Sequence, residues 1–364
     1  MHVHNTRPTK SSEIHYNREK SKVREAYSTH INMNIGIVGA GTWGTALGLL
    51  LNSNGHQVTM WSHNVQAIKE MMNTQSHKNL PGIIVPEEII LTNCLKRTVS
   101  NQDFVIMAVP SVHTRSVAQK MQPYVVKDQI IVNVSKGIEH DTLMTISAQI
   151  EEELPMAQVA VLSGPSHAEE VARGLPTTCV AAAQNEQVAK SIQETFMNET
   201  FRVYTSSDVI GVEIGAALKN VIALAAGIAD GLGCGDNTKA ALITRGIAEI
   251  GRLGVKMGGK PETFAGLTGI GDLIVTCASQ HSRNRKAGYL MGQGYSMNKA
   301  VAEVGMVVEG INSAKAALAL AQKYNESMPI VEQVNAVLFN NKTAAQGLYE
   351  LMVRDGRAEH KNVQ

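Results

Sequence analysis

Short apolar runs alternate with helical stretches from Asn34 to about residue 206. Runs with few polar positions predict strands buried on both faces, and the stretches between them predict the helices that cover those faces. The predicted strands span 35–40, 57–61, 104–110, 129–135, 159–164, 177–183 and 201–206. The predicted helices between them include 45–54, 113–121, 142–154 and 186–197.

After about Asp208 the strand pattern stops, and helical periodicity punctuated by Gly, Pro and Asn continues almost to the end. The predicted helices span 211–233, 237–257, 298–305, 312–324, 330–340 and 343–354. No flexible Ser/Gly linker separates the halves, so we expect them to pack firmly. The pattern predicts an α/β fold, with a Rossmann-type doubly wound, mostly parallel sheet at 33–208 and an all-α domain at 209–358.

Residues 1–32 are polar and lack the apolar region of a secretory signal. The acidic residues Glu13, Glu19 and Glu25 argue against an organelle-targeting peptide. We interpret 1–32 as a disordered extension upstream of a start at Met33, with a regulatory arm as the alternative. Residues 359–364 are predicted to be a short tail.

The composition, with 44% hydrophobic and 18% charged residues, is typical of a globular protein, and 364 residues suggest two domains. A formal net charge of +1 and 4% aromatic residues argue against a nucleic-acid partner. The four cysteines show no CxxC or Cys/His metal spacing, which indicates a reducing cytoplasm and no metal. The most apolar stretch, 214–228, is short for a membrane span of about 20 residues, so we expect no integral membrane segment.

The first predicted strand leads into GAGTWGTALG, which sets Gly39, Gly41 and Gly44 in GxGxxG spacing. The first glycine allows a tight turn, the second a close approach of a pyrophosphate, and the third close packing of helix on strand. A pyrophosphate would lie on the N-terminus of the helix that begins near Thr42. The motif predicts a dinucleotide-binding domain, and a tight turn without a ligand is the alternative.

The second predicted strand is followed by Ser62, His63 and Asn64, where an NAD-specific site usually has Asp or Glu. The absence of a carboxylate removes repulsion against a 2′-phosphate and favours NADPH. No arginine clamp is present at this point, so NADPH and NADH both remain open.

Four further segments carry candidate chemistry, namely 133–137, 163–170, 269–277 and 281–286. The first two follow predicted strands, where doubly wound sheets bind ligands. Asp272 and Thr276 are spaced for one face of a helix, and HSRNRK offers donors that suit a phosphate. Taken singly, Lys136 could be a solvated strand end, Asp272 a helix N-cap and the arginines a solvated surface.

Lys219 is unusual because its helical neighbours Gly215, Ala216, Ile222 and Ala223 are all apolar. Desolvation lowers the pKa of a lysine, and a proton donor works best with a pKa near the working pH. Lys219 is therefore a candidate general acid, and Asn220 beside it is a second polar residue in the same apolar helix. A nearby Lys136 would lower the pKa further and Asp272 would oppose that shift, and the sequence leaves the order of the two open.

The motifs GAGTWGTAL, SKG, SGPSHAEE, KNVIALAAG, ALITRG, GLTGIGDLIVTC, SRNRKAG and VVEG occur in the order found in bacterial NAD(P)-dependent glycerol-3-phosphate dehydrogenases, which the chain resembles from about Met33 to Arg354. GDLIVTC and SRNR separate it from 6-phosphogluconate and 3-hydroxyisobutyrate dehydrogenases. The resemblance implies reversible reduction of dihydroxyacetone phosphate, a small phosphorylated triose, to sn-glycerol 3-phosphate. It also implies supply of glycerophospholipid synthesis by a cytoplasmic homodimer.

The resemblance also implies roles for individual residues. Lys219 matches the catalytic lysine, and Lys136 and Asp272 complete the expected catalytic group. The expected substrate contacts are Lys136, Gly164, Ser166, Lys219, Asn220, Asp272, Thr276, Ser282, Arg283 and Asn284. The expected cofactor contacts are Gly39, Gly41, Thr42, Trp43, Gly44, His63, Lys136, Ala168, Arg283, Val307 and Glu309. Trp43 stands where many relatives carry Tyr or Phe.

Three other functions compete with this interpretation. The chain could be a two-domain NADPH reductase for a different hydroxy acid or imine, a non-catalytic dinucleotide sensor, or a nucleic-acid binder through 281–286. The retention of Lys219, Asp272 and Arg283 argues against the sensor, and the near-zero net charge argues against the nucleic-acid binder.

Overall fold

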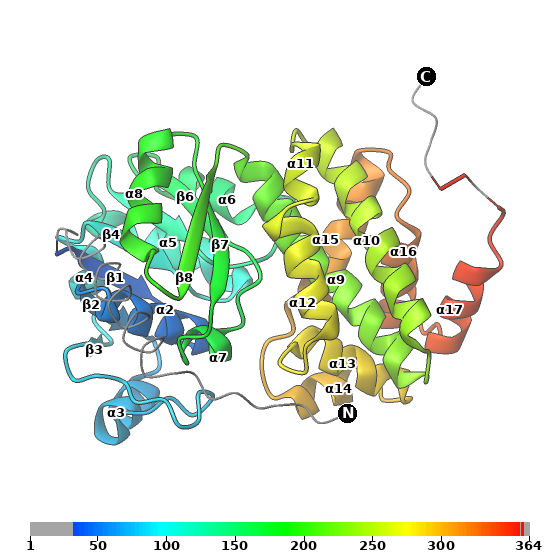
Figure 1. The fold of residues 1–364 in the computed structure, drawn as a ribbon, viewed down its shortest axis with the longest axis horizontal. Coiled ribbons are helices and arrows are strands. Elements are labelled where there is room, and N and C mark those ends of the chain that lie inside the picture. Colours follow the sequence, from blue (N-terminus) through cyan, green and yellow to red (C-terminus); the bar gives the residue numbers. More distant parts are fainter. Residues whose placement is uncertain (1–31, 357, 360–364) are drawn as a thin grey trace, which may run out of the picture.

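The computed structural model describes residues 32–356 and 358–359. The predicted extension at 1–32 and the predicted tail at 359–364 lie outside the described residues, apart from Asn32 and Glu359. The described chain forms a sheet-containing N-terminal domain beside an all-helical C-terminal domain, as Figure 1 shows.

The N-terminal domain contains one eight-stranded sheet with strand order β3-β2-β1-β4-β5-β6-β7-β8. Its strands are β1 Asn34–Val38, β2 Gln57–Trp61, β3 Ile90–Thr92, β4 Phe104–Met107, β5 Ile130–Asn133, β6 Gln158–Ser163, β7 Thr177–Ala182 and β8 Phe201–Ser206. Only β6 and β7 pair antiparallel, which confirms the prediction of a mostly parallel sheet. All seven predicted strands are present, whereas β3 was missed because it is only three residues long and partly buried, too short for a strand pattern.

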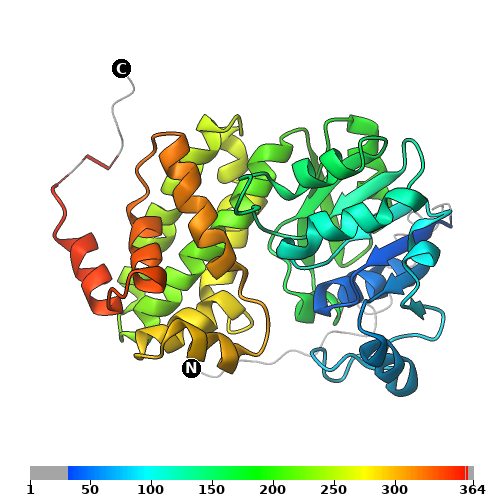
Figure 2. The same cartoon turned by 180° about the vertical axis from the view of Figure 1, so that it is seen from behind.

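Helices cover both faces of this sheet (Figures 1 and 2). They are α2 Thr42–Ser53, α3 Val65–Thr74, α4 Leu95–Val99, α5 Thr114–Met121, α6 Ile146–Glu153, α7 Ala168–Val171 and α8 Glu186–Phe196, with short 3-10 turns η1 Ser111–His113 and η2 Gln122–Tyr124. Phe104 and Ile106 pack into the hydrophobic cluster on one face, and Val105 and Met107 into the cluster on the other. This two-sided burial explains why the strands read as continuous apolar runs.

The helix predicted at 142–154 begins four residues late, and this part of the prediction was wrong. Leu143 has a positive φ of 61°, which a right-handed helix does not allow. Thr145 then caps α6 by accepting a hydrogen bond from the backbone N–H of Ala148.

The C-terminal domain contains no strand among its described residues, as predicted. Its helices are α9 Val209–Gly231, α10 Asp236–Lys256, α11 Pro261–Phe264, α12 Asp272–Ala278, α13 Arg283–Gly292, α14 Met297–Val304, α15 Glu309–Lys323, α16 Pro329–Phe339 and α17 Ala344–Met352, with a π-helical turn η3 at Leu267–Gly271. The sequence pattern did not predict α11, α12 and α13 as helices, because they are short or polar. Helix α15 begins three residues before its predicted start, at Glu309.

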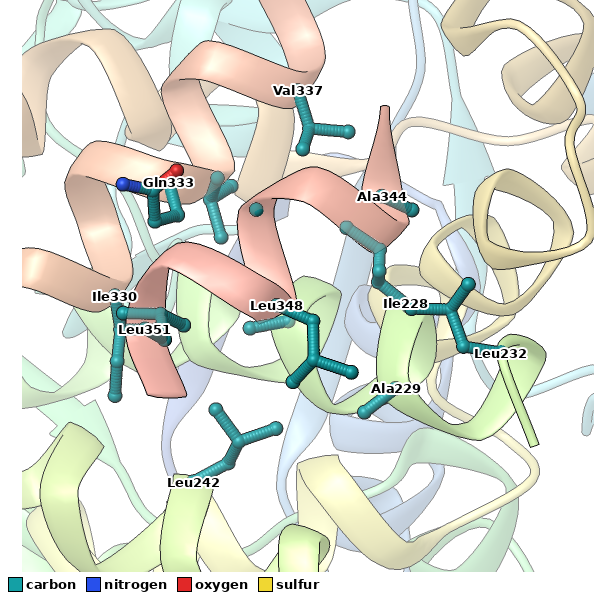
Figure 3. Close-up of a pocket in the computed structure, with 13 residues that line it drawn as sticks. Ile228, Ala229, Leu232, Leu242, Ile330, Gln333, Val337, Ala344, Leu348 and Leu351 are labelled. Carbon is teal, nitrogen blue, oxygen red and sulfur yellow. The ribbon is translucent and has the colours of Figure 1, made fainter. Parts of the chain in front are cut away.

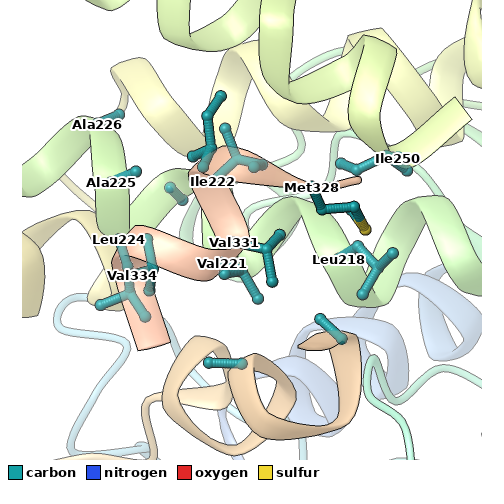
Figure 4. Close-up of a cluster of buried hydrophobic side chains, with 14 of the residues drawn as sticks. Leu218, Val221, Ile222, Leu224, Ala225, Ala226, Ile250, Met328, Val331 and Val334 are labelled. Atoms are coloured by element: carbon teal, nitrogen blue, oxygen red, sulfur yellow. The ribbon is translucent and has the colours of Figure 1, made fainter. Parts of the chain in front are cut away.

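Helix α9 is the central element of this domain, and its side chains are buried from Gly211 to Ala229. Leu218, Val221 and Ile222 pack against Ile250 of α10 and Val331 of α16, as Figure 4 shows. By length and composition α9 could cross a membrane, but 89% of its most apolar window is buried against the rest of the protein. Its hydrophobicity is therefore that of a core helix.

Helix α13 packs closely on α9 because a glycine of each helix faces the backbone of the other. A Cβ at Gly227 would lie 2.1 Å from the carbonyl oxygen of Arg285, and one at Gly288 would lie 2.2 Å from that of Leu224. The two backbones therefore approach to a distance that no larger residue permits. This approach brings the start of α13 to the turn of α9 that carries Lys219 and Asn220.

An apolar pocket lies between α9, α10, α16 and α17, and Figure 3 shows aliphatic side chains such as Ile228, Leu242 and Leu348 around it. At the rise of an α-helix, Ile228 lies about 14 Å along α9 from Lys219. This pocket is separate from the polar residues described below.

Candidate active site

The ammonium of Lys219 is held in a buried polar group inside the helical domain. Its Nζ donates to Oδ1 of Asp272 at 2.6 Å and to Oγ1 of Thr276 at 2.6 Å. Asp272 and Thr276 lie one turn apart on α12, as their spacing predicted, and the Thr276 hydroxyl donates to the Asp272 carbonyl at 2.7 Å. All three side chains are buried.

Lys136 reaches the same carboxylate from the other domain. It follows β5, and its Nζ donates to Oδ2 of Asp272 at 2.7 Å and to the carbonyl oxygen of Gly164 at 3.1 Å. Ser166 also donates to the Gly164 carbonyl, at 3.0 Å. β5 and β6 are neighbours, so their C-terminal ends bring these residues to one edge of the sheet.

Burial lowers the pKa of Lys219 to about 8, and it is the largest influence. The charge of Asp272 opposes this shift, and the charge of Lys136 adds to it. Burial also works against ionisation of Asp272, but Lys136 and Lys219 together hold the pKa of that carboxyl below its usual range. The question left open by the sequence was whether Asp272 or Lys136 has the larger influence on the pKa of Lys219. Asp272 contacts the amine directly and has the larger influence, and burial outweighs both.

The start of α13 is held against α9, the helix that carries Lys219, by a hydrogen bond between the side-chain amides of Asn284 and Asn220. Asn284 Nδ2 donates to Oδ1 of Asn220 at 2.9 Å, and Asn284 Oδ1 accepts from the backbone N–H of Gly310 at 2.8 Å. Ser282 caps α13 by accepting from the N–H of Arg285 at 3.2 Å. The predicted substrate residues Asn220, Ser282 and Asn284 are thus brought together, with Asn220 and Asn284 hydrogen-bonded to each other.

The two arginines of HSRNRK have different surroundings. Arg285 forms an ion pair with Asp230 at 2.6 Å, so its guanidinium serves the packing of α13 on α9. Arg283 is exposed at the first position of α13. Arg283 is therefore the arginine that can meet a ligand from solvent.

The glycine turn after β1 has the geometry of a phosphate cradle. Gly39 has φ 123°, and a Cβ there would lie 2.6 Å from the carbonyl oxygen of Ala108. Gly41 is exposed, and a Cβ there would meet nothing within 4 Å. A Cβ at Gly44 would lie 1.9 Å from the Gly39 carbonyl oxygen, so the turn has the close backbone packing that the motif requires.

The N-terminus of α2 can receive an anion. No side chain caps it, and the buried hydroxyl of Thr42 has no hydrogen-bond partner. Backbone N–H groups and a helix dipole at such an end favour a phosphate. The polar atoms without partners in the protein fit a dinucleotide pyrophosphate.

The other predicted cofactor residues lie around this turn and at the domain junction. Trp43 is half-buried on α2, Ala168 is buried at the start of α7, and His63 is exposed beyond the end of β2. Val307 is exposed just before α15.

Glu309 joins the two domains at the first position of α15. Its carboxylate accepts from the Ser111 hydroxyl at 2.6 Å and from the Ser111 backbone N–H at 3.2 Å. Ser111 lies in the loop after β4, and its side chain is close to the position that a Cβ on Gly137 would occupy. Glu309 therefore lies near the loop that carries Lys136.

Sequence reasoning missed His167, which lies inside the quoted segment SGPSHAEE. Burial lowers the pKa of His167, and the charges of Lys219 and Lys136 lower it further. Its ring lies 5.9 Å, centroid to centroid, from that of His281. The Nε2 atom of His167 is buried without a hydrogen-bond partner. The signal available in the sequence was its place between Ser166 and Ala168, two of the predicted contacts.

Metal ligation has no candidate within residues 32–356, 358 and 359, because no three His, Cys, Asp or Glu side chains gather there. The arrangement offers two amines on one carboxylate, an exposed guanidinium and an uncapped glycine turn.

Comparison with known proteins identifies the family. The chain matches the family described as NAD-dependent glycerol-3-phosphate dehydrogenase over its N-terminal part at residues 34–189 and over its C-terminal part at residues 208–349. A glycerol-3-phosphate dehydrogenase (NAD(P)+) of Agathobacter rectalis is 60% identical over 331 residues, which cover 91% of this chain and 98% of the relative. The relative of the same name from Bacillus subtilis is 51% identical over 322 residues, 87% of this chain and 93% of its own.

A solved structure has the same fold over nearly the whole described chain. The crystal structure of glycerol-3-phosphate dehydrogenase from Coxiella burnetii matches with a TM-score of 0.86 at 38% identity, and covers 89% of this chain and 99% of that one. Both domains and their order are therefore shared. The chain belongs to the NAD-dependent glycerol-3-phosphate dehydrogenase family, whose members are nicotinamide-dependent oxidoreductases.

Proposed function

We propose that this protein reduces dihydroxyacetone phosphate to sn-glycerol 3-phosphate, reversibly, with Lys219 as the general acid. The observation that carries the proposal is the buried Lys219 amine, 2.6 Å from Asp272, with its pKa lowered to about 8. A pKa close to neutral suits a group that gives up a proton in one direction and accepts it in the other. The names of the relatives at 51–60% identity support the choice of substrate.

Reduction of a ketone needs a proton on oxygen and a hydride on carbon, and a bound nicotinamide supplies the hydride. The Lys219 ammonium donates the proton to the carbonyl oxygen. Asp272 and Thr276 accept its other hydrogen bonds and orient the amine. Lys136 places a second cation on the same carboxylate, which favours negative charge developing on the substrate oxygen.

The phosphate of the substrate would lie at the start of α13, against Arg283 and Ser282. Arg283 is exposed there, and a guanidinium binds a phosphate through charge-assisted hydrogen bonds. The Asn220–Asn284 bond ties this helix start to the residue beside Lys219. Binding energy at the phosphate can thereby orient the carbonyl toward the amine. Gly164 and Ser166 would complete the contacts.

The dinucleotide would bind with its pyrophosphate over Gly41 and the N-terminus of α2, where the unpartnered Thr42 hydroxyl gives direct support. Trp43, Ala168, Arg283, Val307 and Glu309 are the further proposed contacts. His63 would approach the adenosine ribose. No carboxylate stands at 62–64, which favours NADPH over NADH.

We also propose, from the resemblance, that the protein is a cytoplasmic homodimer that supplies glycerophospholipid synthesis. Dihydroxyacetone phosphate is the substrate in this proposal, and nucleic acid is not a partner.

An initial-rate assay tests the function. Dihydroxyacetone phosphate is offered with NADPH and with NADH, and oxidation of the cofactor is followed by absorbance. We expect turnover with both and a higher kcat/KM with NADPH. Unphosphorylated dihydroxyacetone and a small 2-keto acid serve as controls. Preference for the keto acid would contradict the proposal and favour the rival reductase.

A further inference from the structure

Glu213 is a buried carboxyl that the proposed reaction does not use. It precedes Lys219 on α9 and is 5% exposed. Burial raises its pKa, although neighbouring hydrogen-bond donors oppose the shift. Burial of a carboxyl costs free energy unless hydrogen bonds offset the loss of water. The hydrogen-bond partners of Glu213 therefore indicate its structural role.

One oxygen of Glu213 holds both ends of the segment that carries Lys136. Oε1 accepts from Nδ2 of Asn133, the last residue of β5, at 3.2 Å. It also accepts from the backbone N–H of Ser147, in the first turn of α6, at 2.9 Å. Lys136 lies between Asn133 and Ser147, so a single side chain of α9 joins the two ends of its loop.

The turn between Asn133 and Lys136 is itself closed by hydrogen bonds. Asn133 Oδ1 accepts from the backbone N–H of Ser135 at 2.9 Å, and Asn133 Nδ2 donates to the Ser135 carbonyl at 3.2 Å. The Ser135 hydroxyl donates to the carbonyl of Val109 at 2.5 Å. A displacement of Asn133 therefore displaces the backbone of Ser135 and with it Lys136.

We propose that Glu213 is a positioning residue, which clamps the Lys136 loop against α9 and so sets the placement of Lys136 relative to Lys219. The inference rests on the proposed function only in assigning these two lysines to the reaction. Glu213 acts through its acceptor oxygen, so glutamine can replace it and an aliphatic side chain cannot.

The first test compares Glu213→Leu with Glu213→Gln by steady-state kinetics. Misplacement of a reacting group by about 1 Å can cost about 100-fold in rate, so we expect kcat of Glu213→Leu to fall between about 10- and 100-fold. NADPH should still bind in a fluorescence titration, because the glycine turn at Gly39–Gly44 is left intact. Glu213→Gln should retain most of the activity, because it keeps an acceptor for Asn133 and Ser147.

A second readout follows the titration of Lys219. The charge of Lys136 lowers the pKa of Lys219, so release of Lys136 from Asp272 should raise it. We expect the rate of acetylation of Lys219 by acetic anhydride, measured by peptide mass spectrometry against pH, to shift to higher pH in Glu213→Leu. This readout needs no turnover. An inactive wild type would overturn the proposed function while leaving this test intact.

Glu249→Leu is the matched control. Glu249 is a buried carboxyl on α10 that also accepts from the backbone N–H of a helix start, that of Ile330. Its hydrogen bonds go to the start of α16 and not to the Lys136 loop, so its loss should lower the melting temperature without moving the Lys219 titration. An equal shift in both variants would show a general structural effect and overturn the proposal.

A double-mutant cycle separates an effect through Lys136 from an independent one. In a Lys136→Met background, Glu213→Leu should reduce kcat by less than twofold further. If the effects of Glu213→Leu and Lys136→Met on kcat were fully additive, the proposal would be overturned. It would also be overturned if Glu213→Leu had the kcat and the Lys219 titration of the wild type. If Glu213→Leu does not fold, Asn133→Ala cuts the same link on the strand side. In Asn133→Ala the acetylation of Lys219 should likewise shift to higher pH, and the absence of that shift would count against the proposal.

Discussion

Lys219 and Asp272 form a buried ion pair, with Nζ of the lysine 2.6 Å from Oδ1 of the aspartate. The other oxygen of the same carboxylate holds Lys136 at 2.7 Å. Two cations thus share one anion, and the cluster has an excess of positive charge. Such a site stabilises negative charge on a substrate oxygen and keeps one lysine close to losing its proton.

Replacement of Lys219 by alanine should lower kcat at least about 100-fold, because the proton donor is lost. Binding of NADPH should survive, since the glycine turn at Gly39–Gly44 lies in the other domain. Initial rates and a fluorescence titration of NADPH measure the two effects. Lys256→Ala, which removes a surface amine from α10, is the control. Near-normal turnover of Lys219→Ala would exclude it as the acid.

The rate of reduction should fall as the pH rises through about 8, because Lys219 must carry the proton that it donates. The rate of oxidation of glycerol 3-phosphate should rise over the same range, because the neutral amine accepts the proton. Profiles of kcat against pH in both directions test this. If both rates changed in the same direction with pH, the assignment of Lys219 as the general acid would be contradicted.

Asp272→Asn should move the limb of the reduction profile to lower pH. The carboxylate raises the pKa of Lys219, so its removal leaves burial and Lys136 to lower that pKa further. It also leaves two lysines without their anion, which should reduce thermal stability. The pH profile and a melting curve are both needed. If the fall in the rate of reduction moved to higher pH, the expected direction of the pKa shift would be wrong.

Arg283→Ala should raise the KM for dihydroxyacetone phosphate by about 10- to 100-fold, from the loss of a charged hydrogen bond of about 1.5–3 kcal/mol. Weak turnover of unphosphorylated dihydroxyacetone should change little. Lys286→Ala, a nearby exposed cation on the same helix, is the matched control. NADPH affinity is measured separately, because Arg283 is also a proposed cofactor contact. An unchanged KM would remove Arg283 from the phosphate site.

Glu249 should make the stability of the helical domain depend on pH. Burial raises its pKa to about 7, although N–H groups of Ile330 and Val331 at the start of α16 oppose the shift. The folded state then holds a proton that the unfolded state loses near pH 4.5, so stability falls as the pH rises from about 4.5 to 7, by roughly 3 kcal/mol.

Glu249→Gln should remove this dependence, because glutamine keeps an acceptor for Ile330 and carries no charge. Melting temperatures at pH 5 and pH 8 test it in the wild type and the variant. The difference between the two pH values should be smaller in Glu249→Gln, and an equal difference would show that another group is responsible.

Local periodicity was sufficient to predict most of the fold. Strands buried on both faces form unbroken apolar runs, so seven of them could be located from the sequence. The partly buried β3 is only three residues long, too short for such a pattern. The late start of α6 depends on the left-handed conformation of Leu143, which residue type did not indicate. Short helices such as α12 and α13 span too few turns for a repeat of apolar positions to be recognised in the sequence.

The sequence by itself determined that Lys219 would be desolvated, because its neighbours on one helix are apolar, and that Gly39, Gly41 and Gly44 would form a cradle after a strand. Tertiary structure alone decided what lies beside that lysine. Asp272 is 53 positions from Lys219, and Lys136 is 136 positions from Asp272. Periodicity reports only contacts within one element, whereas the pKa of a buried amine depends on charges a few ångströms away. Those charges come from segments that only the packing of the two domains brings together.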